Sequence, residues 1–522
     1  MFMRKTFFLF FLIFINVNLY SIQNLPGLEN LQKAKIKQLY KNLDQKSVVQ
    51  HFAFYRIYPE TEEGKLALKK AWNLLKQENV KDPLVLPTLD ISLMINLVNN
   101  QNSIIPDDLD EEKLDFLESL GKNLKNRNLK GNSVWKKDDL LKLANNEIDL
   151  SRALFLEELG EEKESIYKIR YYEATLDLMA LQILAKLNTN PTDIDKVNAI
   201  NDFIFYEKRF RFPPHSLQAK EIDTYTFLSS VMDSRRGVCL GVSVLYLSLA
   251  QRLGLDLEII TPPGHIYIRY KDKDGKITNI ETTARGVDYP SDVYLGIETK
   301  KLQQRTINEV PGMVFFNQAS LYWANEKYDT AIELYEKALK YMPDDPNVKL
   351  LLGLNLLFVN RVKEGKKFLL ELKDYKSEYL TTKENLVEDF LKKKTDIESL
   401  KAIFLHVDET RESIIKKQKS LLEIVKKYPL FRGALFQLIN TYLQLGREKE
   451  ALVYLNKYYE IDKEDPIANY YIAAISFERF DYLNAWKYLK NTEKLLEKEN
   501  HNPKALKSFK EALKRALADP NI

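Results

Sequence analysis

Three side chains in the middle of this sequence have the types and the order of a thiol-based catalytic site. Cys239 is the only cysteine among the 522 residues, His265 follows it by 26 positions, and Glu281 follows the histidine by 16. A thiol can act as a nucleophile, an imidazole can hold its proton, and a carboxylate can fix the imidazole tautomer. The sequence therefore predicts a Cys–His–Glu set, provided that the fold brings the three side chains together.

Cys239 stands where a loop is predicted to enter a largely buried helix that ends at Gly254. The N-terminal end of a helix, together with the arginines of the preceding Arg-Arg-Gly stretch at 235–237, favours the thiolate. A buried, inert cysteine is the alternative, and it is the commoner situation for this residue type. Gly237 and Gly241 weigh against that alternative, because they suit a tight turn with a close backbone approach.

His265 opens a predicted strand at 265–270, and a second strand is predicted at 276–283. A two-residue turn at 274–275 would direct Glu281 away from the face that carries His265. A three-residue loop at 273–275 pairs position 267 with 281 and puts Glu281 diagonal to His265 on the same face. The sequence Lys-Asp-Gly-Lys favours the three-residue loop. Asn279 and Asp288 are the alternative groups for orienting the imidazole.

Four further residues are weaker candidates for the same site. Arg209, Arg211 and His215 precede it and are candidates for the border of a substrate cleft, although an exposed basic loop is the more frequent role. Tyr225 is a candidate hydrogen-bond donor to an oxyanion, with core packing as the commoner alternative. The backbone N–H of Cys239, at the start of a helix, is a better oxyanion donor on physical grounds.

The composition argues against several other functions. The five histidines, at positions 51, 215, 265, 406 and 501, show neither HxH nor HxxxH spacing, so we expect no metal site and no cofactor. A net charge of +4, from 78 Lys and Arg against 74 Asp and Glu, is too balanced to predict a nucleic-acid partner. A single cysteine cannot form an intramolecular disulfide.

Residues 1–21 have the pattern of a secretory signal peptide. A basic start is followed by an apolar run from Thr6 to Ile15, and the small Ser21 is the expected last residue removed. The run is shorter than the roughly 20 residues of a transmembrane helix. An uncleaved N-terminal anchor is the alternative, and it is the only form in which we expect membrane attachment. In either case we expect export, to the periplasm, the outer surface or the medium.

Residues 312–522 repeat with a period of 34. The spacing from Ala331 to Gly365 is 34, and so is the spacing from Ala451 to Ala485. The first unit has the tetratricopeptide (TPR) pattern, with Phe315, Ala319, Tyr322, Ala331, Tyr335, Ala338 and Pro343 at its signature positions. The distance from Ala331 to Ala451 is 120, which is not a multiple of 34, so an irregular helical stretch at about 375–428 interrupts the array. Small residues recur because paired helices pack closely only where small side chains meet.

Part of the chain upstream of the repeats resembles the transglutaminase-like superfamily, and more narrowly its SirB-type group. The resemblance covers residues 166–290 and rests on Tyr225-Thr-Phe-Leu, Arg235-Arg-Gly-Val-Cys, Leu245-Tyr-Leu-Ser-Leu, Pro263-Gly-His and Asn279-Ile-Glu-Thr-Thr. It implies Cys239 as nucleophile, His265 as general base and Glu281 at the acid position, where the superfamily usually has Asp. Members of the SirB-type group often lack the cysteine, which this chain retains.

We therefore expect a mostly helical α+β protein. A helical N-terminal region at 22–164 precedes a papain/transglutaminase-like α+β core at 165–300 and a C-terminal TPR α-solenoid. The expected function is an exported cysteine hydrolase or acyl transferase acting on an amide or peptide bond, whose repeats bind a protein or peptide partner. The alternative is a catalytically inactive transglutaminase-like/TPR protein that serves as a protein–protein interaction scaffold.

Overall fold

A computed structural model describes residues 28–77, 91–99, 105–106, 109–213, 224–383, 385–408 and 410–520. The expected signal segment at 1–21 and the candidate His215 lie outside these residues. The chain divides into two compact units, Met1–Asn123 with Ala174–Pro191, and Leu124–Glu173 with Thr192–Ile522. The three residues of the predicted thiol site all lie in the second unit. The boundary between 164 and 165 that we expect from the sequence stays a prediction.

The described part of the first unit is helical. Its aromatic core is built around Trp72, whose ring lies edge-on to Phe52 with 5.3 Å between centroids, and 6.0 Å from Phe116. Across the described parts of both units, no helix has the length and apolar character needed to cross a membrane. The helices of the first unit are α1 (Leu28–Lys41), α2 (Val48–Ile57), α3 (Glu62–Lys76), α4 (Ile91–Asn99), α5 (Glu111–Leu120) and the second part of α8 (Lys163–Lys186).

The second unit begins with helices that surround one central helix, α11 (Cys239–Leu253). Nearly every residue of α11 after Cys239 is buried, as the apolar run predicts. The helix ends where Gly254 takes a left-handed conformation with φ 63°. The α-helical and π-helical elements that precede α11 in this unit are α6 (Lys137–Leu140), α7 (Leu150–Leu159), the first part of α8, α9 (Asp193–Asn201), the π-helical turn Asp202–Glu207 and α10 (Leu228–Ser234).

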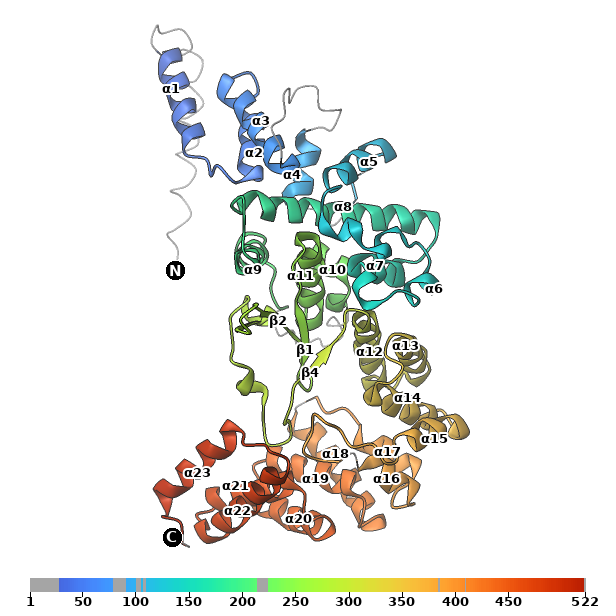
Figure 1. The fold of residues 1–522 in the computed structure, drawn as a ribbon. Helices are drawn as coiled ribbons and strands as arrows, with labels where there is room; N and C mark the ends of the chain where they lie inside the picture. Colours follow the sequence, from blue (N-terminus) through green and yellow to red (C-terminus); the bar gives the residue numbers. More distant parts are fainter. Residues whose placement is uncertain are drawn as a thin grey trace, which may run out of the picture. The chain divides into compact units, whose positions relative to one another are not determined.

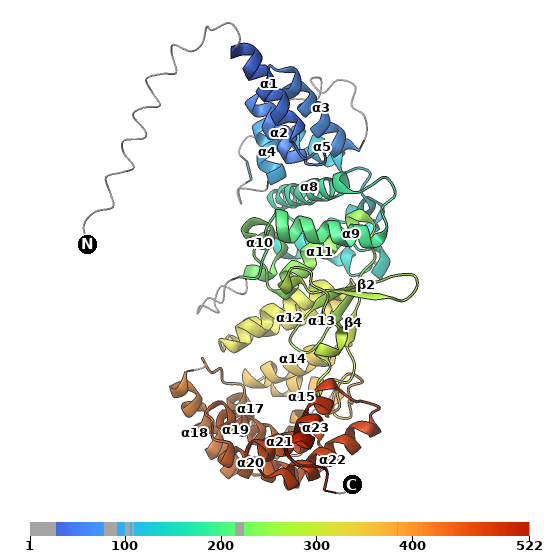
Figure 2. The same cartoon turned by 90° about the vertical axis from the view of Figure 1, so that its left-hand side faces the viewer.

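A four-stranded antiparallel sheet follows α11, in the order β3-β2-β1-β4. Figures 1 and 2 show it next to α11, and β2 packs against that helix. Ile266, Tyr267 and Ile268, around the start of this strand, are all buried. The strands are β1 (Glu258–Thr261), β2 (Tyr267–Lys271), β3 (Ile277–Ile280) and β4 (Gln303–Arg305).

The hairpin between β2 and β3 has the register predicted for a three-residue loop. Ile268 lies opposite Ile280, so position 267 is level with 281. Gly275 takes the left-handed conformation that this loop requires, with φ 83°. The predicted end of the strand at 283 is wrong, because β3 stops at Ile280. Glu281 instead caps a short 3₁₀ helix, η7 (Thr282–Ala284), and forms an isolated bridge with Val287.

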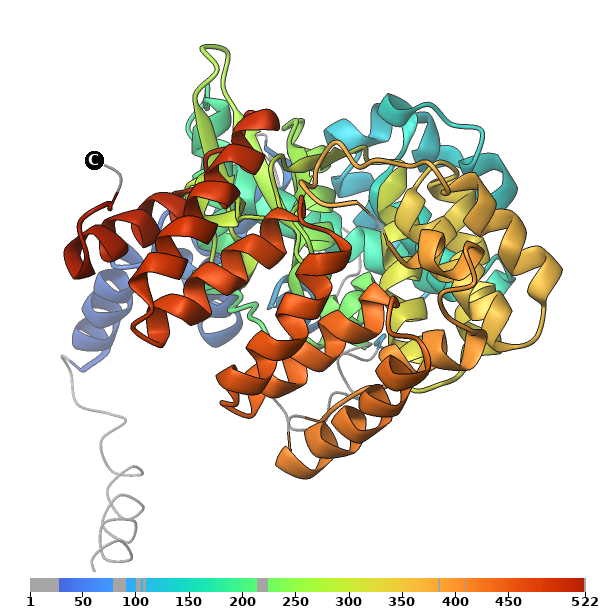
Figure 3. The same cartoon turned by 90° about the horizontal axis from the view of Figure 1, so that it is seen from below.

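The remainder of the second unit consists of the TPR helices, which lie side by side in successive pairs (Figure 3). Close packing depends on the small residues of the 34-residue period, since a Cβ atom on Gly365 would lie 2.6 Å from the carbonyl oxygen of Gly353. The predicted irregular stretch contains the short helices α16 and α17. The helices are α12 (Glu309–Ala324), α13 (Tyr328–Tyr341), α14 (Pro346–Phe358), α15 (Val362–Glu371), α16 (Leu386–Leu391), α17 (Ile397–Ile403), α18 (Arg411–Lys427), α19 (Arg432–Gln444), α20 (Glu448–Ile461), α21 (Pro466–Glu478), α22 (Tyr482–Lys498) and α23 (Lys504–Ala516).

Candidate active site

Cys239 is the first residue of α11, and its side chain is half-buried. The loop before it is fixed by Tyr225, whose carbonyl oxygen accepts the N–H of Val238 at 3.1 Å. The same carbonyl lies so close to the helix that a Cβ atom on Gly241 would be 2.1 Å from it. The close backbone approach expected at this glycine is therefore present. Because Cys239 opens the helix, its own N–H has no acceptor within the helix and faces outward from the first turn.

Thr282 ties the end of the hairpin to the first turn of α11. Its hydroxyl lies 3.4 Å from the carbonyl oxygen of Cys239, to which it donates, and 3.1 Å from the hydroxyl of Ser243. Both Thr282 and Ser243 are buried. Glu281 is the residue before Thr282, so these two contacts hold the backbone of the predicted acid next to the turn that carries the thiol.

His265 contacts both of its predicted partners. Its Nε2 atom lies 2.7 Å from Oε2 of Glu281. The side chain of Cys239 also lies close enough to the imidazole to raise its pKa. An ionised carboxylate can only accept a hydrogen bond, so Nε2 carries the proton toward Glu281 and Nδ1 is the nitrogen left for the thiol. The structure thus brings Cys239, His265 and Glu281 together, with the imidazole between the thiol and the carboxylate.

The carboxylate of Glu281 is nearly buried, with 5% of its side chain exposed, and it is surrounded by donors. Oε1 accepts the backbone N–H of Thr283 at 3.1 Å and its hydroxyl at 2.7 Å. Oε2 accepts the hydroxyl of Tyr294 at 2.5 Å as well as the imidazole of His265. Burial raises the pKa of Glu281, but the bonds from His265, Tyr294 and Thr283 outweigh it and lower the pKa to about 2.

The same contacts favour the charged form of the imidazole. Burial lowers the pKa of His265, but hydrogen bonds to Cys239 and Glu281 and the charge of Glu281 raise it to about 9. A ring that holds a proton between a thiol and a fixed carboxylate can protonate a leaving group and stabilise a thiolate. The electrostatics of the site therefore suit a thiolate–imidazolium pair.

Tyr294 belongs to this site, although no pattern in the sequence selects it. It ends a short 3₁₀ helix, η8 (Ser291–Tyr294), and its ring stacks on His265 and Tyr267 with centroids 5.7 and 4.9 Å apart. Burial and its hydrogen bond to Glu281 raise the pKa of Tyr294, so its hydroxyl keeps its proton and donates. Tyr294 lies in an aperiodic segment, and no spacing rule connects such a segment with the hairpin. Thr283, by contrast, stands in the Asn279-Ile-Glu-Thr-Thr motif.

The two alternatives to Glu281 have other roles. Asp288 accepts the backbone N–H of Asn279 at 2.9 Å. The Asn279 side chain donates to the carbonyl oxygen of Tyr289 at 2.6 Å and accepts from Arg269 at 3.1 Å. These bonds hold the chain between η7 and η8 against β3, and Glu281 is the acid that contacts His265.

The remaining candidates contribute through their backbone or lie at the surface. Arg209 and Arg211 are exposed. The backbone N–H of Arg211 donates to the carbonyl of Arg235 at 3.1 Å, and its carbonyl accepts the N–H of Gly237 at 3.1 Å, which braces the loop before Cys239. Tyr225 contributes the carbonyl described above. No group of His, Cys, Asp or Glu side chains in the described ranges is arranged to hold a metal ion.

Comparison with known families agrees with this arrangement. A model of the transglutaminase-like superfamily matches residues 170–347, and models of the tetratricopeptide repeat match residues 322–381 and 434–465. The chain thus contains a transglutaminase-like domain followed by tetratricopeptide repeats. No relative was found among curated proteins.

Several solved TPR structures are similar to part of the chain. The crystal structure of MamA is 16% identical, covers 35% of this chain and 96% of its own, and has a TM-score of 0.20. A thermophilic TPR protein of Thermus thermophilus is 18% identical over 40% of this chain and 98% of its own, with a TM-score of 0.20. The TPR2AB domain of yeast Sti1, in a complex with pHSP90, is 19% identical over 39% and 85%, with a TM-score of 0.21. At these TM-scores the similarity does not bear on function.

Proposed function

We propose that this protein is a cysteine hydrolase or acyl transferase that acts on an amide or peptide bond. The observation that carries the proposal is the contact of His265 with both Cys239 and Glu281. One ring nitrogen lies 2.7 Å from the carboxylate, and the thiol at the start of a buried helix lies close enough to the imidazole to raise its pKa. This arrangement supports nucleophilic catalysis by a thiol with an oriented base.

In the proposed reaction, the sulfur of Cys239 attacks the carbonyl carbon of the substrate while the amide oxygen becomes an oxyanion. The outward N–H of Cys239 is aligned with the helix dipole and can donate to that oxyanion. His265 then gives its proton to the leaving nitrogen, the C–N bond breaks, and a thioester remains on Cys239. Water or an amine attacks the thioester, His265 takes up the proton of the attacking group, and the thiolate leaves.

The proposal can be tested on the native full-length chain without knowing the substrate. Because Cys239 is the only thiol, alkylation by iodoacetamide reports on one site. We expect rapid alkylation at neutral pH, since the imidazolium stabilises the thiolate. His265→Ala is expected to slow alkylation to the rate of an ordinary thiol, and Cys239→Ala is expected to abolish it. Alkylation that requires prior denaturation would overturn the proposal.

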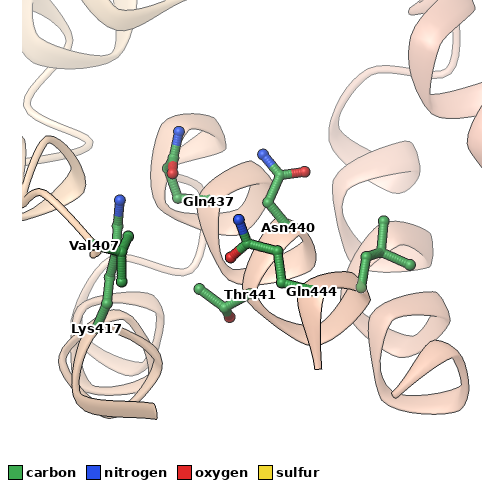
Figure 4. A pocket seen from close by; sticks show the side chains of 7 residues that line it. Val407, Lys417, Gln437, Asn440, Thr441 and Gln444 are labelled. Carbon is green, nitrogen blue, oxygen red and sulfur yellow. The ribbon is translucent and has the colours of Figure 1, made fainter. Parts of the chain in front are cut away.

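The repeats support a second part of the proposal, the binding of a protein or peptide partner. A cavity of about 260 Å³ lies between α18 and α19, and Figure 4 shows the side chains that line it. Lys417 stands on one side, and the amide groups of Gln437, Asn440 and Gln444 stand on the other. Amides and an ammonium group suit the backbone or a carboxylate of an extended segment.

Export through residues 1–21 and membership of the SirB-type group are also part of the proposal. Mass spectrometry of the mature protein should find an N-terminus just after Ser21 when the signal segment is removed. A chain retained with Met1 and fractionating with membranes would instead support the uncleaved anchor.

The competing proposal is an inactive scaffold that acts through its repeats alone. The presence of a TPR array favours partner binding, which both proposals share. The two are separated by a partner pull-down with Cys239→Ala, in parallel with the alkylation rate of the unchanged chain. Partner binding by a chain whose Cys239 reacts like an ordinary thiol would favour the scaffold.

A further inference from the structure

The segment between η8 and β4 leaves the core domain and is held by the C-terminal repeats. We call residues 295–301 the strap. Figure 1 shows it in yellow-green, running from the sheet to the repeat helices and returning to β4. Ile297 is 7% exposed and packs into the cluster formed by Trp486, Leu489 and other buried residues of α21 to α23. A side chain of the core domain thus completes the hydrophobic core of the last repeats.

Polar contacts fix the strap on both sides of Ile297. The carbonyl oxygen of Gly296 accepts a hydrogen bond from Nε2 of His501 at 2.6 Å. The carbonyl oxygen of Glu298 accepts the N–H of Thr381 at 2.8 Å. Lys300 forms an ion pair with Glu499 at 2.7 Å. The repeats therefore hold the strap by its backbone as well as by one apolar side chain.

Tyr294, whose hydroxyl donates to Glu281, immediately precedes the strap. Gly296 follows Tyr294 by two positions, and a fully extended chain covers at most about 7 Å over that distance. Tyr294 is packed against His265 and Tyr267 at its ring and bound to Glu281 at its hydroxyl. A displacement of Gly296 by more than a few ångströms therefore has to move Tyr294.

We propose that Tyr294 is a positioning residue for the His265–Glu281 pair and that the C-terminal repeats keep it in place through the strap. The thiol site is then complete only while the repeats hold residues 295–301. A partner that draws the repeats away from the strap would loosen the site, and one that tightens them would keep it assembled. The effect of this coupling on catalysis rests on the proposed function. The coupling itself can be measured without a substrate, as a change in the reactivity of the Cys239 thiol.

Among the described residues, the titratable groups around His265 and Glu281 can be named. Cys239, Glu281 and Tyr294 contact His265, and Tyr267 and Tyr289 are the titratable neighbours of Tyr294. When the Tyr294 hydroxyl is removed, Glu281 loses one of the two donors on Oε2. The carboxylate then binds a proton more readily and is free to rotate away from the imidazole.

The test measures the rate of alkylation of Cys239 by iodoacetamide between pH 5 and 10 on the full chain. Tyr294→Phe keeps the stacked ring and removes the hydroxyl. We expect the acidic limb of the profile to move to higher pH and alkylation at pH 7 to slow, because a carboxylate that turns away from the imidazole stabilises the imidazolium, and through it the thiolate, less well. Tyr289→Phe is the matched control, because it removes an exposed hydroxyl from the same segment, and its profile should match that of the unchanged chain.

The role of the repeats is tested at His501, which contacts the strap and none of the three site residues. His501→Ala should shift the profile in the same direction as Tyr294→Phe, whereas His501→Gln retains a donor for the Gly296 carbonyl and should restore it. Near-ultraviolet circular dichroism and a thermal melt verify that each variant is folded. Slow, ordinary alkylation of the unchanged chain would refute the proposed function. Fast alkylation that neither variant alters would refute the positioning role, and an effect confined to Tyr294→Phe would refute the coupling to the repeats.

Discussion

Replacing Glu281 by Gln is the most direct test of the electrostatics of the thiol site. Gln has nearly the same shape, so its amide oxygen can still accept the hydrogen bond from Nε2 of His265, which in the native protein spans 2.7 Å. The substitution removes the negative charge and leaves the packing largely intact. It therefore separates the effect of the charge from the effect of the geometry.

The size of the effect follows from the pKa of His265. Burial, Cys239 and Glu281 together move it from 6.5 to about 9. At 1.36 kcal/mol for each pKa unit, the folded site favours the imidazolium by about 3 kcal/mol. Without the carboxylate, burial lowers the pKa and only Cys239 raises it, so we expect a value within about one unit of 6.5. At pH 8 the imidazolium fraction should fall from about 90% to below about 25%.

The pKa of His265 can be read from a titration of histidine labelled with ¹³C, with the resonance assigned by its loss in His265→Ala. Asp288→Asn is the matched control, because it removes a nearby carboxylate that binds Asn279 and does not contact the imidazole. The reasoning is refuted if His265 still titrates near 9 in Glu281→Gln. It is equally refuted if Asp288→Asn lowers the pKa by as much as Glu281→Gln does.

The same pair makes the stability of the protein depend on pH. The folded pKa of His265 is raised, so its contribution is fully present below pH 6.5 and is lost as the pH rises through about 9. Urea unfolding should therefore show the unchanged chain losing up to about 3 kcal/mol across this window. In Glu281→Gln this loss should largely disappear.

Two further predictions concern the surroundings of the site. Gly241→Ala should destabilise the protein strongly, although alanine ordinarily favours a helix by about 1 kcal/mol, because the new Cβ would lie 2.1 Å from the Tyr225 carbonyl. Urea unfolding would measure this, with Gly296→Ala as a tolerated control that meets no atom within 4 Å. Glu158→Gln should raise the melting temperature at pH 8 and leave it nearly unchanged at pH 4. Burial raises the pKa of Glu158 from 4.5 to about 7, so its contribution to stability is lost as the pH rises through that range. An equal change at both pH values would contradict the second prediction.

Local chemistry explains why so much of the thiol site could be read from the sequence. The start of α11 follows from the Arg-Arg-Gly loop and the apolar run after Cys239. The register of the hairpin follows from Gly275, whose φ of 83° is open to glycine at little cost. That register alone places Glu281 level with Tyr267 and diagonal to His265. These features depend on neighbours in the chain, and short-range rules are sufficient for them.

The end of β3 could not be predicted in the same way. The β-branched residues of 276–283 continue past Ile280, yet the strand stops there because Glu281 pairs with Val287 and caps η7. The bonds of Thr282 to α11 make this turn favourable, and they join residues 43 and 39 positions apart. A sequence window of strand length contains no information about such contacts.

The sequence by itself determined the period of the repeats, the helix that begins at Cys239 and the face that carries His265, since each follows from spacings of a few residues or from a repeated one. Only the tertiary structure decided that Tyr294 donates to Glu281 and that His501, 205 positions beyond Gly296, holds the strap. The physical reason is that an aperiodic segment has no preferred conformation of its own. Its position is set by the apolar side chain and the backbone groups that it can satisfy against distant helices.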